Sequence, residues 1–147
     1  MIDCRTLQSA DFEDWLPLWH GYLTFYKAQL APATTQLTFK RLTGAQEPMG
    51  GFIARNADGH ALGIVHWIQH RSCWTEGDYC YLQDLFVAPV QRNAGVGRLL
   101  IEAVYATAAS RACPRVYWLT HETNAAAMKL YDQVAERSGF LQYRKIL

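Results

Sequence analysis

Charge of either sign is sparse in this sequence, and long hydrophobic runs are absent. Lysine and arginine number 14 and aspartate and glutamate 13, so the formal net charge over 147 residues is +1. A chain this close to neutral has no broad electrostatic attraction to nucleic acid or anionic lipid, and we expect neither as a partner. The apolar runs are too short to cross a bilayer, and the N-terminal residues have no signal-peptide character. We therefore expect a cytoplasmic protein.

Cysteine is equally sparse, and no metal-binding spacing is present. The chain has four cysteines, none of them in a CxxC pair: Cys4, Cys73, Cys80 and Cys113. His66 and His70 would share one face of a strand, but no third ligand is evident. His121 and Glu122 are not followed by the second histidine of an HExxH zinc site. We expect ordinary thiols and no metal.

The proportion of hydrophobic residues is nevertheless that of a folded chain. Half of the residues are hydrophobic and 18% are charged, which excludes a disordered acidic or basic protein. The length suits one domain with a substantial core, and no repeat, linker or low-complexity tract divides it. We expect a single domain over residues 1–147.

Two common phosphate-binding glycine patterns are also missing. No GxxxxGK string followed by Ser or Thr occurs, and the dinucleotide pattern GxGxxG lacks its first glycine. The chain has RxxGxG instead, at residues 92–97. This pattern follows an apolar strand, Tyr79–Val87, which ends at the Ala88-Pro89 turn because proline has no amide for a central strand.

The residues after this turn form a glycine-bearing loop and then a helix, which we expect to run to about Arg111. A strand, a loop and a helix start in this order direct several free backbone N–H groups and the positive end of the helix at one spot, which favours pyrophosphate. Gly95 and Gly97 let the backbone approach a phosphate closely, and Arg92 can add a charge-assisted contact. One alternative stays open: the glycines could form a turn that packs the helix on a sheet.

A second pattern lies in the C-terminal third of the chain. Val116–Thr120 is predicted to be a strand, and the helix that follows, Asn124–Glu136, begins at an asparagine suited to a helix cap. Tyr131 lies seven residues after Asn124, two turns along the same helix face. A purely structural interpretation of the pair is also open, in which Asn124 caps the helix and Tyr131 packs in the core.

The expected order of elements is strand, helix, helix, three strands, helix, strand, helix, strand. The N-terminal part comprises a strand over 2–7, a helix over 11–26 that Pro17 should bend or divide, and a helix over 34–42. Strands are expected over 52–55, 61–70 and 79–87, and a final strand over Phe140–Ile146. Strands followed by alternating strand and helix predict an α/β fold, a mixed sheet with helices on both faces.

The two patterns, in this order, resemble the acyl-CoA motifs of the GNAT superfamily of N-acetyltransferases. The strings YLQDLFV and YWLTHETNAAAMKLYDQV carry the likeness. The branch that they resemble contains the spermidine/spermine N-acetyltransferases and the yeast-type histone or polyamine acetyltransferases. The element order is similar to the GNAT fold over nearly the whole chain, whereas the specific motifs occupy residues 79 to 143. The resemblance implies an enzyme that moves acetyl from acetyl-CoA to a primary amine by direct attack in a ternary complex.

The resemblance also implies a set of CoA-binding residues. They are the backbone amides at the end of the fourth strand, the glycine loop with the start of its helix, and the second motif: Leu85, Phe86, Val87, Arg92, Asn93, Ala94, Gly95, Val96, Gly97, Arg98, Asn124 and Tyr131. In the family, the asparagine contacts the pantetheine arm. The tyrosine hydroxyl, here that of Tyr131, acts as the general acid for the leaving thiolate.

The general base stays open, because the sequence departs from the family pattern at one catalytic position. Related enzymes often have a glutamate where this chain has Gln83, and an amide cannot accept a proton at neutral pH. Gln83 could hold a water while a neighbour takes the proton. Asp84, on the opposite strand face, is one candidate, beside Glu122, His121 and the N-terminal helices, and it could equally be a structural acid.

Aromatic residues bear on the substrate and on assembly. The N-terminal half and the loop after the third strand are rich in them: Trp15, Trp19, Tyr22, Tyr26 and Trp74. They are core or dimer contacts in one interpretation, and in another some of them line a pocket for an amine cation. We expect a small primary amine, polyamine-like or amino-acid-like, and a homodimer formed through exposed aromatic surface.

Two alternative functions remain. One is a non-catalytic module that senses acyl-CoA, which the missing glutamate at position 83 favours. The other is an enzyme that acetylates a protein lysine or an N-terminal amine, which would need an open groove rather than a closed aromatic pocket.

Overall fold

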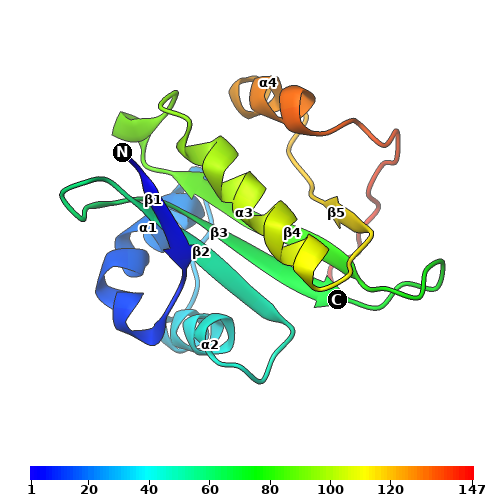
Figure 1. Ribbon diagram of the computed structural model, residues 1–147, viewed down its shortest axis with the longest axis horizontal. Coiled ribbons are helices and arrows are strands. Elements are labelled where there is room, and N and C mark those ends of the chain that lie inside the picture. Colours follow the sequence, from blue (N-terminus) through cyan, green and yellow to red (C-terminus); the bar gives the residue numbers. More distant parts are fainter.

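The computed structural model describes all residues, 1–147. Its centre is one five-stranded sheet in the order β1-β2-β3-β4-β5 (Figure 1). The strands are β1 (Asp3–Thr6), β2 (Met49–Arg55), β3 (Ala61–His70), β4 (Tyr79–Val87) and β5 (Arg115–Tyr117). Consecutive strands from β1 to β4 are antiparallel, and β5 joins β4 in parallel. The mixed sheet expected from the sequence is confirmed.

Helices cover both faces of this sheet, as predicted. The helices α1 (Phe12–Phe25) and α2 (Pro32–Thr43) lie against one face, and α3 (Val96–Ser110) lies against the other (Figure 1). The last helix, α4 (Ala125–Val134), contacts α3. No helix is both long and apolar enough to cross a bilayer, and a cytoplasmic location stays a prediction.

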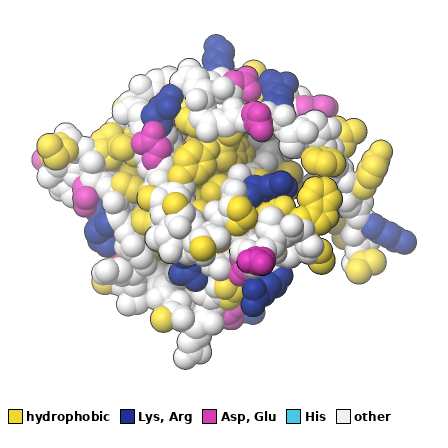
Figure 2. All heavy atoms as spheres, turned by 45° about the vertical axis from the view of Figure 1, so that its right-hand side comes forward, with side chains coloured by type: hydrophobic (Ala, Val, Ile, Leu, Met, Phe, Trp, Pro, Cys, Tyr) yellow, Lys and Arg dark blue, Asp and Glu magenta, His cyan; other side chains and the backbone are white.

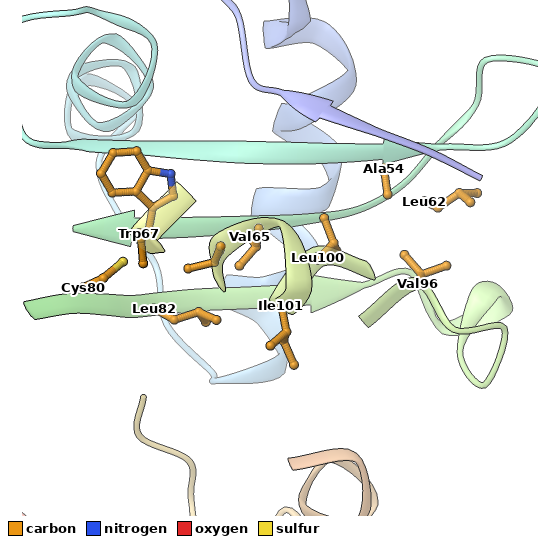
Figure 3. Packing of buried hydrophobic residues seen from close by; sticks show 11 residues of the cluster. Ala54, Leu62, Val65, Trp67, Cys80, Leu82, Val96, Leu100 and Ile101 are labelled. Carbon is orange, nitrogen blue, oxygen red and sulfur yellow. The ribbon is translucent and has the colours of Figure 1, made fainter. Parts of the chain in front are cut away.

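Two hydrophobic layers hold the helices to the sheet. Under α3, Val65 and Leu82 from the strands pack with Leu100 and Ile101 from the helix (Figure 3). On the other face, Trp15 of α1 is fully buried among residues of α2, β2 and β3. Burial of one large apolar side chain contributes about 1.5–3 kcal/mol, so each layer fixes its helix firmly on the sheet.

The helix α1 is continuous although Pro17 lies inside it, so the expected division into two pieces is wrong. A proline in a helix interior removes one hydrogen bond and costs about 3 kcal/mol. The buried residues of α1 lie around it: Trp15, Leu18 and Trp19. Because each contributes roughly 1.5–3 kcal/mol on burial, tertiary packing outweighs the local penalty.

A bulge in β4 changes which side chains face each layer. Against β3, Asp84 pairs with His66 but Leu82 pairs with Trp67, so Gln83 has no partner residue. An extra residue of this kind shifts the alternation of side chains along the strand. Leu82 consequently packs under α3, while the Asp84 carboxylate contacts His66 on the face that α1 covers.

The C-terminal end of the chain differs from the expectation. The strand β5 is shorter than the expected Val116–Thr120, and α4 ends at Val134 rather than Glu136. The final strand expected over Phe140–Ile146 is absent, because residues 135–147 belong to no helix or strand. A strand needs a neighbour that satisfies its backbone N–H and C=O groups, and this segment pairs with none within its own chain.

A buried aspartate joins the start of α1 to the first two strands. The Asp11 carboxylate accepts hydrogen bonds from Arg5 of β1 (2.7 Å) and from Arg55 of β2 (2.9 Å). The backbone amide of Gln8 also donates to it. Burial by itself would raise the pKa of Asp11, but these hydrogen bonds outweigh burial and hold the pKa below its ordinary value.

Replacing Asp11 with asparagine should lower the free energy of unfolding at neutral pH by about 3 kcal/mol, because a buried ion-pair cluster loses its anion. Since the folded-state pKa is lowered, the contribution is complete above the unfolded pKa of about 4. It is lost as the pH falls through the still lower folded value. Urea denaturation from neutral pH to about pH 3 should show Asp11→Asn and the wild type converging at the acid end.

Asp3→Asn is the matched control for this experiment. Asp3 is an exposed carboxylate of β1 that forms no ion pair, so its replacement should change stability by no more than about 0.5 kcal/mol. Equal stability of Asp11→Asn and the wild type at neutral pH would contradict the structural role of Asp11.

Candidate active site

The connection between β4 and α3 leaves a row of backbone amides free. Gly95 is the N-cap residue of α3 and has a φ of +84°, which a residue with a Cβ adopts only with strain. Its carbonyl accepts the bond from Leu99, but no side chain caps the helix. The amides of Asn93, Ala94 and Gly95 donate to no acceptor in the chain. Those of the first helical turn have no intrahelical acceptor either.

Open space lies in front of these amides. A Cβ placed on Gly95 would meet no atom within 4 Å, so a ligand can approach the backbone directly. Asn93 also has a positive φ, of 69°, and consecutive amides in such turns form an anion-binding concavity. With the positive end of α3 behind it, the loop has the geometry that attracts a phosphate.

The second glycine of the motif has a packing role. A Cβ placed on Gly97 would lie 3.1 Å from Cδ2 of Leu130, closer than ordinary van der Waals contact. The absence of that atom allows α4 to pack against the first turn of α3. Arg98 of α3 also donates a hydrogen bond to Gln133 of α4. The alternative interpretation of the motif as a packing turn therefore applies to Gly97 and not to Gly95.

Arg92 does not point freely over the amide row. Its Nε donates to the carbonyl of Val87 at 3.2 Å. The guanidinium carbon lies 5.8 Å from the ring centroid of Phe86 and 5.9 Å from that of Phe25, distances at which a cation is attracted to an aromatic face. In this conformation Arg92 joins the end of β4 to α1, and a phosphate contact requires the side chain to turn.

The outer edge of β4 is open along most of its length. β5 pairs only with Tyr79–Tyr81, so the two strands separate where β4 continues toward Leu85, Phe86 and Val87. The backbone groups on that side have no neighbouring strand. An extended ligand with amide groups can add to such an edge by main-chain hydrogen bonds, and the edge leads directly to the free amides of the loop.

Asn124 lies at the N-cap position of α4, but its side chain does not cap the helix. Its Nδ2 lies 3.4 Å from Oγ1 of Thr120, a long contact, and only its backbone carbonyl takes part in the helix, as acceptor for Met128. The capping role that would explain this asparagine is therefore wrong. The half-buried carboxamide remains available to a ligand.

Tyr131 lies on α4 with its ring packed edge-on against Trp118, at 5.4 Å between centroids. Burial raises the pKa of Tyr131 to about 12, and the charge of Tyr26 contributes in the same direction. The hydroxyl makes no hydrogen bond within the chain and keeps its proton at neutral pH. Tyr131 is thus half-buried, as a core aromatic would be, but presents a protonated, unpaired hydroxyl.

Asp84 is the centre of a polar network that sequence reasoning missed. Its Oδ2 lies 2.9 Å from Nδ1 of His66, and Nε1–H of Trp15 donates to Nε2 of the same ring at 2.9 Å. Because Nε2 accepts, the ring proton is on Nδ1 and is donated to the carboxylate. His66 is 2% exposed, and its hydrogen bond orients the Asp84 carboxylate. The sequence indicates for His66 only the role of a metal ligand.

Tyrosines surround the same carboxylate. Burial raises the pKa values of Tyr22, Tyr26 and Tyr81, and the charge of Asp84 adds to the shift in each case. The charge of Tyr26 also contributes to the raised pKa of Tyr131, so Tyr26 lies near both Asp84 on β4 and Tyr131 on α4.

Gln83 does not join this network. Its side chain is exposed, and it makes no hydrogen bond in the chain. The other aromatic candidates divide between core and surface, since Trp15 and Trp19 are buried in the α1 layer and Trp74 is 80% exposed. No three His, Cys, Asp or Glu side chains are grouped in a way that could hold a metal ion.

A large groove adjoins Tyr131 on the side of β5. Its volume is about 1450 Å³, and it is lined by residues of β4, α3, β5 and α4 and by residues that follow β5 and α4, among them Tyr81, Tyr117, Trp118, Tyr131 and Phe140. Figure 2 turns this side of the molecule forward and shows hydrophobic side chains gathered in and around a hollow. The groove is mostly aromatic and apolar, and it is open to solvent.

The sequence of the chain is similar to known N-acetyltransferases. The profile of the acetyltransferase (GNAT) family matches residues 6–135. A D-amino-acid N-acetyltransferase of Saccharomyces cerevisiae is 33% identical over 145 residues, which covers 98% of this chain and 90% of the yeast protein.

Solved structures share the fold. A ribosomal-protein-alanine N-acetyltransferase from Brucella melitensis biovar Abortus 2308 superposes with a TM-score of 0.84 at 20% identity, with all of both chains covered. The aminoglycoside N-acetyltransferase AAC(6')-Iy, in complex with a CoA-containing bisubstrate analogue, also gives a TM-score of 0.84, at 22% identity, covering 100% of this chain and 99% of the other. At these identities the likeness shows the fold alone.

Gly95→Glu should reduce CoA affinity by about 100-fold or more, because bulk and negative charge would fill the space in front of the amides. Gly59→Glu is the matched control, because Gly59 has a φ of +86° and equally open surroundings but lies in the β2–β3 turn. Isothermal titration calorimetry with CoA should separate the two variants. Equal binding by both would mean that the loop does not hold the phosphates.

Proposed function

The chain belongs to the acetyltransferase (GNAT) family, and we propose that it transfers the acetyl group of acetyl-CoA to the primary amine of a small molecule. The observation that carries the proposal is the continuity of the open β4 edge with the free amides at the start of α3. One extended ligand with amides at one end and phosphates at the other fits both. The amine attacks the thioester directly, without a covalent enzyme intermediate.

The CoA molecule would lie along these two features. The pyrophosphate would accept hydrogen bonds from the amides of Asn93 to Arg98, with Arg92 turning toward it. The pantetheine arm would pair with the backbone of Leu85 to Val87, and the Asn124 carboxamide would contact its amides from the α4 side. Two features support this placement: the backbone amides of the loop are free, and the Asn124 side chain is not engaged in capping its helix.

Asp84, rather than Gln83, would bind the substrate amine and accept its proton. A substrate ammonium beside the carboxylate gains a charge-assisted hydrogen bond, and the carboxylate can take its proton, directly or through a water, as the C–N bond forms. The Nδ1–H bond from His66 fixes the orientation of the carboxylate. The Gln83 amide cannot accept a proton at neutral pH. Its side chain is exposed and lies outside the Asp84 network, which supports Asp84 as the group that takes the proton.

Tyr131 would supply the proton to the leaving thiolate of CoA. Its hydroxyl is protonated at working pH and has no internal acceptor, so it is free to donate when the thiolate forms. Together the residues give the amine a base on β4 and the thiolate an acid on α4.

A small amine fits this site better than a protein segment. Tyr22 of α1 and Tyr81 of β4 lie near enough to Asp84 for its charge to raise their pKa values, and Arg92 lies over the ring of Phe25 beside the end of β4; aromatic side chains around a carboxylate suit a small ammonium. The name of the yeast relative supports an amino-acid amine in particular. The proposal is tested by incubating the protein with acetyl-CoA and each member of a panel of D- and L-amino acids, polyamines and lysine peptides. Transfer is measured by detecting the thiol of the CoA that is released. CoA binding without turnover on any amine would favour an acyl-CoA sensor instead.

Tyr131→Phe should lower kcat by about 10²-fold while CoA affinity stays close to that of the wild type, because only the proton donor is removed. Since burial holds the pKa of Tyr131 near 12, the wild-type rate should not fall from loss of this proton below about pH 10. Steady-state kinetics across pH measures both effects. Full turnover of Tyr131→Phe at every pH would contradict the acid role.

Tyr105→Phe is the control for that variant. The Tyr105 hydroxyl donates to the carbonyl of Val134 at 2.8 Å, so its loss should cost about 1 kcal/mol of stability and leave kcat nearly unchanged.

Asp84→Asn should reduce kcat/KM by about 10²-fold or more, since the amide keeps the shape of the carboxylate but neither pairs with an ammonium nor accepts its proton. Gln83→Ala, at the adjacent residue of the bulge, should change kcat/KM by less than about threefold. Comparison of the two variants with the same amine decides between the neighbours. A larger loss for Gln83→Ala would assign the proton transfer to a water held by Gln83.

A further inference from the structure

His66 is the only buried histidine of the chain, and both of its ring nitrogens are occupied. It is 2% exposed, whereas the other histidines lie on the surface. Its Nδ1 lies 2.9 Å from Oδ2 of Asp84, and its Nε2 accepts the indole N–H of Trp15 at 2.9 Å. This chain of two hydrogen bonds ends on the carboxylate that would take the substrate proton.

Packing fixes the direction of the Trp15 N–H. Trp15 is fully buried, and its ring stacks on Trp19 at 5.4 Å between centroids and contacts Phe39 at 4.8 Å. An indole has one donor and no acceptor, so in this position it serves one partner, Nε2 of His66. Trp19 packs against the same imidazole, also at 5.4 Å between ring centroids, but its own N–H donates to Oγ1 of Thr35 at 3.3 Å.

The other groups around His66 supply no competing cation. On β2, Gly51 faces the ring without a side chain, and a Cβ there would lie 3.2 Å from Cδ2 of His66. On β4, the Asp84 carboxylate pairs with His66 and with no lysine or arginine. The titratable groups around that carboxylate are tyrosines whose pKa values are raised by burial, so they are neutral at working pH: Tyr22, Tyr26 and Tyr81.

A second proton on this imidazole would break the chain of hydrogen bonds. Nε2 accepts the Trp15 N–H through its lone pair, and a proton on Nε2 would occupy that lone pair. Two N–H groups would then face each other in a buried place, which leaves both donors unsatisfied. The hydrogen bond from Trp15 therefore favours imidazole over imidazolium.

We propose that Trp15 is a positioning residue for the acetyl transfer: its N–H keeps His66 neutral, and a neutral His66 leaves the Asp84 carboxylate free to pair with the substrate ammonium. This rests on the proposed function, in which Asp84 takes the proton of the amine. A histidinium would hold the carboxylate in an ion pair, which weakens its attraction for a second cation and lowers its affinity for a proton. A neutral imidazole donates the same hydrogen bond without the charge.

The same arrangement determines where the substrate proton goes. As the C–N bond forms, an N–H bond of the substrate breaks and an O–H bond forms on Asp84. The proton cannot continue to His66, because Nδ1 already bears one and Nε2 is occupied by Trp15. It stays on the Asp84 carboxyl group until solvent removes it after the transfer.

Solution NMR of the protein labelled with ¹⁵N-histidine measures the state of the ring directly, through the shifts of its two nitrogens. At about pH 6, the ratio of imidazolium to imidazole at His66 should be at least about tenfold higher in Trp15→Phe than in the wild type, because the variant lacks the N–H that occupies Nε2. Trp19→Phe is the matched control. It removes the same volume beside the same imidazole but no hydrogen bond to it, so its ratio should equal that of the wild type.

Replacement of Trp15 with benzothienylalanine keeps the measurement decisive if Trp15→Phe does not fold. This side chain has the two fused rings of tryptophan but a sulfur atom in place of the N–H, so it retains the packing and loses only the donor. Its ratio of imidazolium to imidazole should be as high as that of Trp15→Phe. A ratio unchanged from the wild type, or one raised equally by Trp19→Phe, would overturn the proposal.

Kinetics across pH separate this role of Trp15 from packing alone. KM for the amine should be about tenfold higher in Trp15→Phe than in the wild type at about pH 6, where His66 of the variant is charged. At about pH 8, where the ring is neutral in both proteins, the two KM values should be similar. A loss of packing alone would raise KM equally at both pH values, and that result would overturn the positioning role.

The two measurements distinguish this proposal from the proposed function. Should the wild type transfer no acetyl group to any amine, the proposed function fails, but the NMR comparison still decides whether Trp15 keeps His66 neutral, because it does not depend on turnover.

Discussion

The proposed site depends on one constraint, namely that β4 is paired with β3 at every residue except the bulged Gln83, but with β5 at only three residues. Pairing with β3 on both sides of the bulge holds the strand in place. Divergence from β5 leaves main-chain groups free at the same place where the strand leads into the α3 loop. A ligand can therefore use backbone groups that in an ordinary sheet would already be bonded. In the proposed complex, the separation of two neighbouring strands thus supplies the binding surface.

The bulge at Gln83 decides what faces that surface. Without it, Asp84 would share a face with Leu82 and lie under α3, where an unpaired charge would be costly. The extra residue turns the carboxylate toward α1, where His66 and Trp15 hold it by a chain of two hydrogen bonds. The same local irregularity leaves position 83 exposed. A change from glutamate to glutamine is tolerable at such a position if the neighbouring carboxylate serves the amine.

The parts of the structure that were predictable from sequence are local. The glycine loop, the helix after it and the order of elements up to α4 follow from turn residues and periodicity, which act within a few residues. The continuity of α1 through Pro17 was not predictable, because it depends on packing against strands far along the chain. The Asp84–His66 contact joins positions 18 residues apart through a bulge that has no sequence signature. The final strand expected over Phe140–Ile146 is absent, because the pattern of side chains alone does not supply the neighbouring strand that its backbone groups would need.

The missing Cβ of Gly97 has a mechanical consequence. Because Leu130 packs into the space that a side chain at position 97 would take, α4 lies directly against the first turn of α3. Tyr131 follows Leu130, so this contact fixes the position of Tyr131 relative to the turn whose amides hold the phosphates in the proposed complex. A larger residue at position 97 would therefore push the proposed proton donor away from the proposed phosphate site without altering either group itself.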